Sequence, residues 1–407
     1  MELLKKWVPR LLICGALLAL GSFLLYRWLA AEPVYEGRPL SAWLDDFQRG
    51  RTLAAREKAT EVLKGIGPEG LRYLSGHLTN PPTPMQRAAR AMSGYVPNRL
   101  KEPLRRLYDP SQNFSRKLAT LEVLKTIGTN GASLVPAVEK ALRQENVVLS
   151  SIAATTLGQL GTNSVPVLIA ALDDPDYNVR SPACHALATF TTNAAPAVPR
   201  LARIARDEIG PMNSVAFYAL SRVGKAAVPS LTELAASTNA TIRSRALSAL
   251  NGIGAAAEDA RPAILGAVDD PVAEVRWRAV EALSLLEGNS AESQEAFVAA
   301  LSDPDANVRA AAVTALSFRP RLTRENFPKV YEMLRDPSPG VRAQAALALG
   351  QTGHWAAEAI PHLEAATSDT NSLVSANARR AIETIRNSQK IVETESINSG
   401  AGQRQAE

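Results

Sequence analysis

The four histidines are the side chains in this sequence best suited to metal or acid–base chemistry. They are His77, His185, His354 and His362, and the residue after each is Leu, Ala, Trp and Leu in turn, so no His-Glu pair is present. His354 and His362 lie eight residues apart without an obvious third ligand, whereas a zinc site needs at least three protein ligands. The sequence also has no Gly-rich phosphate loop and no nucleophile elbow. We therefore expect no catalytic centre, no metal and no cofactor.

Basic residues recur in a pattern that could bind a polyanion. Four of the Arg residues follow an Asp by six positions, in the pairs Asp174 and Arg180, Asp270 and Arg276, Asp303 and Arg309, and Asp336 and Arg342. Looser groups are Arg200, Arg203 and Arg206, and Arg319, Arg321 and Arg324. The net charge is only +5 over 407 residues. We do not expect a nucleic-acid partner, and an acidic polymer remains an alternative.

The elements that carry these residues follow from a regular spacing of apolar and small side chains. Eight anchor positions recur at intervals of 30 or 33 residues: Leu149, Val179, Met212, Ile242, Val275, Val308, Val341 and Val374. The residue four positions after every anchor is Ala, and eight positions after it stands Leu or, once, Ile. Positions 0, 4, 7 and 8 share one face of a helix, and Ala on that face allows a second helix to approach closely. One such unit cannot bury its apolar face alone, so the units must stack.

Three weaker units, anchored near Ala55, Pro84 and Arg116, bring the total to about eleven. Asp-Pro pairs such as Asp303-Pro304 are predicted to open each long helix, with Asp as the N-cap. Gly161 and Gly353 are predicted to end long helices, and Val165-Pro166, Val228-Pro229 and Ile360-Pro361 to begin shorter ones. The expected fold is an all-α solenoid of two-helix repeats over residues 50–387.

The segment Asp-Pro-Asp-Ala-Asn-Val-Arg309, with Ala312 and Ala315-Leu316, resembles the HEAT-like repeat family, specifically the bacterial short-repeat type first associated with phycobilin lyases. The resemblance implies that the Asp and Arg pairs form a hydrogen-bonded ladder between neighbouring units. A bilin lyase-like or enzyme-accessory role is the second alternative that it implies. The di-iron chemistry of the HEAT-like enzyme deoxyhypusine hydroxylase needs His-Glu pairs, which this sequence lacks.

Positions 2 and 6 after each anchor share a face turned away from positions 0 and 4. Most residues there are small, and the larger ones include Trp277, His185, Tyr218 and Glu281. If the family's arrangement holds, this face is the concave one, and its aromatic residues are candidate anchors for a protein partner. The alternative is that Trp277 fills space against a neighbouring helix.

The N-terminal segment, residues 1–31, is predicted to be a hydrophobic membrane helix. Residues 11–26 carry no charge, Lys5, Lys6 and Arg10 precede them, and Arg27 follows. The basic side predicts a cytoplasmic N-terminus and an exported repeat body in a single-pass membrane protein. A cleaved signal, which would leave a secreted or periplasmic protein, is the alternative.

The remaining segments flank the repeats. Residues 32–49 are predicted to be a lead-in with a capping helix, in which Ser41 caps the helix and Trp43 and Leu44 cover the end of the stack. The stretch Tyr35–Leu44 looks like the start of membrane-anchored repeat proteins of this kind. Residues 388–407 have few apolar side chains and are predicted to be a disordered tail. The function expected from all of this is a membrane-tethered, non-enzymatic scaffold for protein–protein contact.

Overall fold

The buried surface of this protein is built from the repeated alanine and leucine positions. The computed structural model describes residues 32–50, 52–79, 110–144, 146–286, 290–317 and 326–403. The alanines four positions after the eight anchors all have 0% of their surface exposed, and the apolar residues eight positions after them are at most 8% exposed. The periodicity therefore identified the core correctly.

The chain divides into two compact units, Met1–Ala186 and Leu187–Glu407, and the boundary falls within helix α11. The first unit contains, in order, β1 (Val34–Tyr35), β2 (Arg38–Pro39), α2 (Leu40–Arg49), α3 (Leu53–Lys64), α4 (Pro68–Thr79), α7 (Pro110–Ile127), α8 (Val135–Leu142), α9 (Val147–Gln159), α10 (Val165–Ala171) and most of α11 (Tyr177–Thr189). The second contains α12 (Val198–Asp207), α13 (Pro211–Val223), α14 (Val228–Ala235), α15 (Ala240–Ile253), α16 (Arg261–Gly266), α17 (Ala273–Leu285), α18 (Ala291–Ala300), α19 (Ala306–Ser317), α20 (Phe327–Glu332), α21 (Pro339–Gln351), α22 (Ile360–Ala366) and α23 (Ser372–Gln403).

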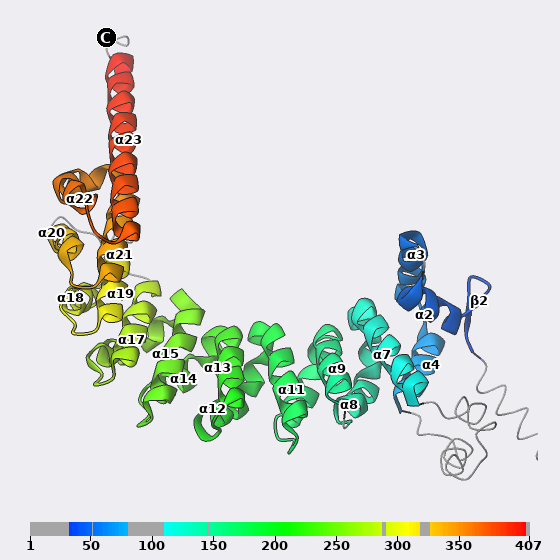
Figure 1. The fold of residues 1–407 in the computed structure, drawn as a ribbon. Helices are drawn as coiled ribbons and strands as arrows, with labels where there is room; N and C mark the ends of the chain where they lie inside the picture. Colours follow the sequence, from blue (N-terminus) through cyan, green and yellow to red (C-terminus); the bar gives the residue numbers. More distant parts are fainter. Residues whose placement is uncertain are drawn as a thin grey trace, which may run out of the picture. The chain divides into compact units, whose positions relative to one another are not determined.

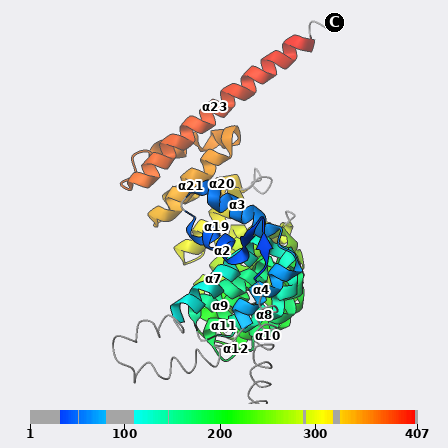
Figure 2. The ribbon, with the colours of Figure 1, turned by 90° about the vertical axis from the view of Figure 1, so that its right-hand side faces the viewer.

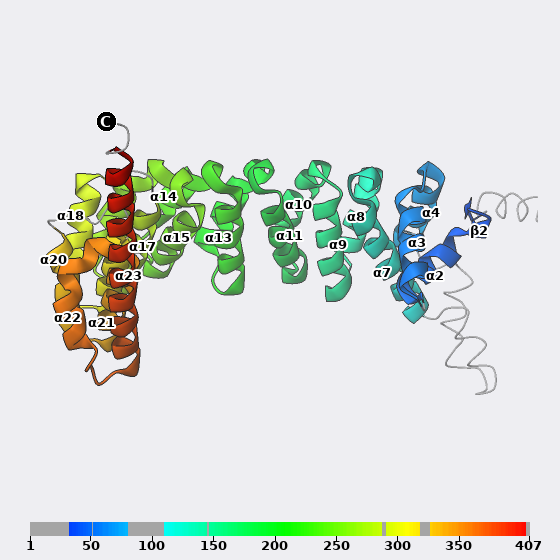
Figure 3. The ribbon, with the colours of Figure 1, turned by 90° about the horizontal axis from the view of Figure 1, so that it is seen from above.

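Within each unit the long helices stack side by side and the shorter helices form a second layer (Figures 1 and 3). In the second unit, α13, α15, α17, α19 and α21 each contact the next long helix along the chain, and α23 is the last of the series. The described residues are helical apart from turns and the two-residue strands β1 and β2. The expected class of fold, an α-solenoid of two-helix repeats, is confirmed for them.

A short 3₁₀ turn joins most long helices to the shorter helices that follow. Gly161 and Gly353 lie at two of these junctions with φ of 96° and 61°, a left-handed conformation that glycine adopts at little cost. Pro166, Pro229 and Pro361 stand in the first turn of α10, α14 and α22. Their missing N–H has no helical partner at that position. Both predicted boundary signals are confirmed.

The Asp-Pro signal was read wrongly by a few residues. The helix after Asp270-Pro271 begins at Ala273, and its N-cap is Val272. The Asp270 carboxylate instead accepts a hydrogen bond from the Val272 N–H at 2.9 Å. The same bond joins Asp336 to the Ser338 N–H at 2.8 Å. These Asp residues close a turn that leads into the helix, because an Asp side chain readily bonds the backbone N–H two residues on.

The lead-in of the first unit contains a hairpin that the sequence pattern did not predict. Val34 pairs with Pro39 and Tyr35 with Arg38, around Glu36 and Gly37, both of which have positive φ. The Trp43 indole N–H donates to the Tyr35 carbonyl at 2.9 Å, and the Arg38 guanidinium lies 4.3 Å from the Trp43 ring centroid. This hairpin holds α2 in place.

The capping helix was predicted correctly in kind but not in detail. Trp43 is 4% and Leu44 6% exposed, so both are buried as expected. Ser41 does not cap α2, because the helix begins at Leu40 and the Ser41 N–H, within the first turn, donates to the Glu32 carboxylate. The first-turn N–H groups of a helix have no acceptor within the helix, and Glu32 supplies an acceptor for one of these groups.

Three predicted segments differ from, or lie outside, what the structure describes. The membrane segment over residues 1–31 and the unit anchored at Pro84 lie outside the described residues. Helices α3 and α4 contact α7 and α8 directly. Residues 388–403, predicted to be disordered, continue α23, which extends past α21 and α22 (Figure 2). No proline interrupts that stretch, and the helix continues through Gly400 and Gly402.

Candidate functional site

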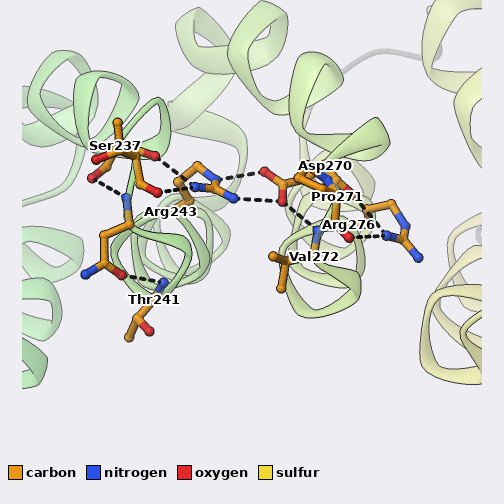
Figure 4. A network of polar contacts seen from close by, with 9 residues as sticks. Ser237, Thr241, Arg243, Asp270, Pro271, Val272 and Arg276 are labelled. Carbon is orange, nitrogen blue, oxygen red and sulfur yellow. Dashed lines mark hydrogen bonds and ion pairs between the residues drawn. The ribbon is translucent and has the colours of Figure 1, made fainter.

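Arginine residues at the start of the long helices link each repeat to the next. In α15 the Arg243 guanidinium donates from Nε and Nη2 to the two carboxylate oxygens of Asp270, at 2.7 and 2.9 Å (Figure 4). Its remaining nitrogen, Nη1, donates to the carbonyl oxygens of Ser237 and Thr238, at 2.9 and 3.0 Å. One planar side chain therefore joins the turn before its own helix to the turn before the next long helix, α17.

The same arrangement recurs three times further along the second unit. The pairs are Arg276 with Asp303, Arg309 with Asp336, and Arg342 with Asp369, each with Nε 2.7 Å from the nearer carboxylate oxygen. In each case Nη1 also donates to the carbonyl oxygens of the residues six and five positions earlier. The Arg309 Nη1, for example, donates to the carbonyl oxygens of Asp303 and Pro304. The four Arg–Asp pairs are named the Arg–Asp ladder below.

In the first unit only parts of this arrangement are seen. The Arg180 Nη1 donates to the carbonyl oxygens of Asp174 and Pro175, both at 2.9 Å. The Asp174 carboxylate accepts from Arg143, at 2.7 Å, instead of from an Arg at the start of a long helix.

The ladder lowers the pKa of its Asp carboxyls and raises the pKa of its Arg side chains, so both shifts favour the charged forms. Burial alone raises the pKa of the Asp303 carboxyl, but hydrogen bonds from Arg276 and from the Asp305 N–H outweigh it and leave that pKa below its usual value. The hydrogen bond to Asp303 raises the pKa of Arg276. Asp270 and Asp336 follow the same pattern as Asp303.

The structure joins the predicted Asp and Arg residues in a different way from their spacing of six. Each Arg contacts the backbone carbonyl of the Asp six residues earlier, while its carboxylate partner lies 27 residues later, in the next repeat. Asp369 completes the last pair but was missed, because no proline follows it. Arg243 was missed as a ladder member because no Asp precedes it by six residues.

These contacts occupy the basic residues that were candidates for a polyanion row. The ladder Arg side chains are 13–17% exposed. Among the looser basic groups, Arg206 forms an ion pair with Glu233 at 2.7 Å, and Arg319, Arg321 and Arg324 lie outside the described residues.

The candidate partner-binding residues lie on the long helices at the exposed positions 2 and 6. Trp277 of α17 is half-buried, and the Arg278 guanidinium lies 4.0 Å from the centroid of its indole ring. Arg278 also pairs with Glu281, one turn along α17, at 3.0 Å. Trp277, Arg278 and Glu281 thus form one contiguous cluster, named the Trp277 cluster below.

Two other large apolar side chains of the second unit lie at position 6 of their repeats. Tyr218 on α13 is 51% exposed and Leu347 on α21 is 37% exposed. At position 6 of α15, between α13 and α17 in the stack, stands the small, exposed Ser248. In the first unit, His185 is exposed on α11. Position 2 is less open than expected: Ser244 is buried and donates to the Glu274 carboxylate at 2.9 Å.

The other histidines that are described have structural neighbours. The His362 ring stacks on Tyr331 with centroids 4.4 Å apart, and His77 packs edge-on against Tyr73 at 4.7 Å. Across the described ranges there is no group of three or more His, Cys, Asp or Glu residues placed to bind a metal ion. Within the same ranges no helix has both the length and the apolar character that a membrane span requires.

Comparison with known proteins identifies the repeat. A sequence model for HEAT repeats matches residues 100–188, 134–221, 165–251, 228–317 and 294–383, which together span more than half of the chain. A comparison with curated proteins gives no match. The fold is similar to that of Kap121p bound to Nup53p, with 15% identity and a TM-score of 0.52 over 87% of this chain and 46% of that chain. It is also similar to Kap121p bound to Pho4p, with 15% identity and a TM-score of 0.51 over 87% of this chain and 47% of that chain. The present chain spans about half the length of these structures.

Proposed function

This chain belongs to the HEAT-repeat family, and we propose that it is a non-enzymatic scaffold that binds a protein partner through the exposed face of its long helices. The observation that carries the proposal is the Trp277 cluster. Its aromatic ring, guanidinium and carboxylate are of the kinds that dominate protein interfaces, and they stand beside helix positions that are otherwise small. The Kap121p structures, which contain Nup53p or Pho4p, support a protein as the partner.

Two features of the second unit favour a protein over an acidic polymer as the ligand. The ladder Arg residues are committed to carboxylate and carbonyl oxygens. The exposed face offers Tyr218 and Leu347 in addition to the Trp277 cluster, and apolar groups of this size contribute to protein contacts rather than to contacts with a polyanion.

The test is capture of partners from membrane extracts by the full chain and by single variants. Trp277→Ala should weaken capture of the stoichiometric partner, because truncation removes the central ring of the cluster. Leu285→Ala is the matched control, since Leu285 lies on the same helix, is 48% exposed, and is outside the cluster. Equal capture by Trp277→Ala and the wild-type chain would exclude this surface. Capture abolished by moderate salt would instead favour the polyanion alternative.

A membrane tether is the second part of the proposal. It rests on the uncharged run over residues 11–26, the basic residues before it and the aromatic residues at its ends, which are typical of a spanning helix with a cytoplasmic N-terminus. The repeat body would then be exported. After extraction at alkaline pH the full chain should stay in the membrane pellet, whereas a chain that begins at Glu32 should be released. Release of the expressed full chain with a new N-terminus, found by N-terminal sequencing of the supernatant, would instead support the alternative, a cleaved signal.

A further inference from the structure

A polar cavity of about 560 Å³ opens among helices α2, α4 and α7 of the first unit. Its volume is in the range of sites that bind small ligands or short segments, roughly 300–1,000 Å³. Most of the side chains that line it are polar or charged, which is unusual beside a core of Ala and Leu. The residues that matter below are Glu32, Asp45, Arg49, Tyr73, His77 and Arg116.

The cavity exists because three helices turn polar faces toward one another. Ser41, Asp45 and Gln48 follow at helical spacing on α2, and Tyr73 and His77 lie one turn apart on α4. The third wall comes from α7, which contacts both α2 and α4.

One wall is fixed by a hydrogen bond. The Glu32 carboxylate accepts a hydrogen bond from the Ser41 N–H. Burial, together with Glu32, raises the pKa of Tyr73 to about 12, so the phenol stays protonated at neutral pH. The negative charge of Glu32 therefore already has a donor in the Ser41 N–H.

His77 presents an acceptor to the same space. Its Nδ1 lies 3.3 Å from the Thr120 hydroxyl oxygen, and that hydroxyl donates its own hydrogen to the Arg116 carbonyl at 2.8 Å. The Nδ1–H must therefore be the donor to Thr120, which assigns the lone pair of the neutral ring to Nε2. Burial and the nearby Arg116 lower the pKa of His77, so the ring is neutral at pH 7.

Two guanidinium groups that line this cavity have no polar partner in the part of the chain that the structure describes. Among the described residues, the side chains of Arg49 and Arg116 make no hydrogen bond and no ion pair. Two other Arg residues of the same region do have partners: Arg38 pairs with Asp46 at 2.8 Å, and Arg56 donates to the Gly50 carbonyl at 2.9 Å. Two unpaired guanidinium groups, from α2 and α7, suit an anionic group held between them.

We propose that this cavity binds a carboxylate of a peptide segment, with Arg49 and Arg116 as donors to the carboxylate and Asp45 and His77 as acceptors for N–H groups of the same segment. The cavity carries two basic and two acidic side chains, so a singly charged group that brings its own N–H donors fits better than a phosphate dianion. The inference rests on the proposed function in that the segment belongs to a protein partner.

The test measures fluorescence anisotropy of labelled pentapeptide pools, randomised in sequence, with the full detergent-solubilised chain. One pool has a free C-terminal carboxylate and no acidic side chains, a second is amidated and lacks acidic residues, a third is amidated with an internal Glu, and a fourth is amidated with an internal phosphoserine. The free-acid pool, the Glu pool or both should bind at least about tenfold more tightly than the amidated neutral pool, because charge-assisted bonds to Arg are lost with the carboxylate. The first and third pools distinguish a chain terminus from an acidic side chain as the source.

Arg116→Gln should weaken binding by about tenfold or more, and Arg49→Gln should do the same. The matched control is Arg72→Gln, since Arg72 is exposed on α4 and does not line the cavity. Circular dichroism of each variant shows whether the helices are intact. Unchanged affinity in folded Arg116→Gln, or preference for a phosphorylated pool, would overturn the proposal.

The two proposals fail in distinguishable ways. If partner capture depends on Trp277 but no peptide pool binds through a carboxylate, the cavity is excluded as a binding site and the scaffold function stands. If carboxylate binding depends on Arg116 but partner capture does not depend on Trp277, the cavity stands as a binding site and the Trp277 cluster is excluded as one.

Discussion

Single buried residues decide how closely the helices of each repeat pack. The alanines four positions after the anchors are wholly buried, and the leucines eight positions after them fill the space alongside. The sequence predicted this core because alanine and leucine recur with little variation. Single side chains with two possible environments were less predictable: Ser244 is buried by a contact with Glu274, a residue of the next repeat.

Leu316→Ala should destabilise the protein by about 2–5 kcal/mol, because Leu316 is 0% exposed and its truncation leaves a cavity. The free energy of unfolding in urea measures the effect. Leu285→Ala, at a side chain that is 48% exposed, should cost less than about 1 kcal/mol. Equal losses in the two variants would contradict the assignment of the core.

Thr191→Gly should stabilise the protein by about 0.5–1 kcal/mol. Thr191 has φ of 50°, at a junction where Gly161, Gly224 and Gly353 stand in other repeats, and a left-handed conformation is costly for a β-branched residue. Its side chain is exposed, so little packing is lost. Thermal unfolding provides the measurement, and Thr192→Gly is the control, expected not to raise the midpoint.

At the scale of elements, the Arg–Asp ladder joins consecutive long helices of the second unit. The sequence indicated which residue types take part, because the Asp-Pro and Arg positions repeat with the anchors. It did not show which Asp each Arg contacts, since the partner lies in another repeat and its position depends on how the helices stack. The hairpin at Glu36 and Gly37 was missed for a related reason: strands of two residues carry too few side chains for an alternating pattern.

A double-mutant cycle on Arg276 and Asp303 should give a coupling energy of about 1–3 kcal/mol, since the pair is bidentate and its side chains are only 14% and 10% exposed. The matched control is Arg386 and Glu364, which lie 2.8 Å apart but are each 55% exposed. Its coupling should be below about 1 kcal/mol. Equal coupling energies in the two cycles would mean that burial of the ladder pair does not strengthen the interaction between Arg and Asp.

Acid should weaken the ladder in a defined pH window. The pKa values of Asp270, Asp303 and Asp336 are lowered in the folded protein, so below the ordinary value of 3.8 the unfolded chain binds protons that the folded chain does not. The ladder's contribution to stability is therefore complete above that pH and is lost as the pH falls from 3.8 through the lowered folded values. Urea unfolding over this range should show a smaller pH slope for Asp303→Asn, and an unchanged slope would argue against the shift.

At the scale of the whole molecule, the chain is a series of repeats whose contacts are mainly with neighbours. Repetition made the class of fold and the location of its core predictable from the sequence. The cavity among α2, α4 and α7 was not predictable, because it lies where the series begins and one of its walls, α2 with Glu32, belongs to a lead-in that does not repeat. Of its residues, the sequence had pointed to His77 for metal or acid–base chemistry, and to Ser41, Leu44 and Arg116 only for roles in the fold.

Leu157→Ala and Leu316→Ala should have additive effects on the free energy of unfolding, within about 0.5 kcal/mol, because their repeats share no neighbour. Both residues are 0% exposed, and they belong to different units. The double variant, measured in urea with both single variants, tests this. A double loss well beyond the sum would show that the two repeats are energetically coupled.

Each ladder Arg pairs with an Asp 27 residues later, and this constant separation has a consequence for how the length of such a protein can change. Excision of residues 337–369 would bring Asp336 directly before Thr370, so that Asn371 takes the place of Ser338 two residues after the carboxylate. Arg309 would keep its partner Asp336, and α23 would inherit the junction that α21 now occupies. Loss or gain of one 33-residue repeat therefore leaves an Arg–Asp pair between each two neighbouring repeats of the ladder.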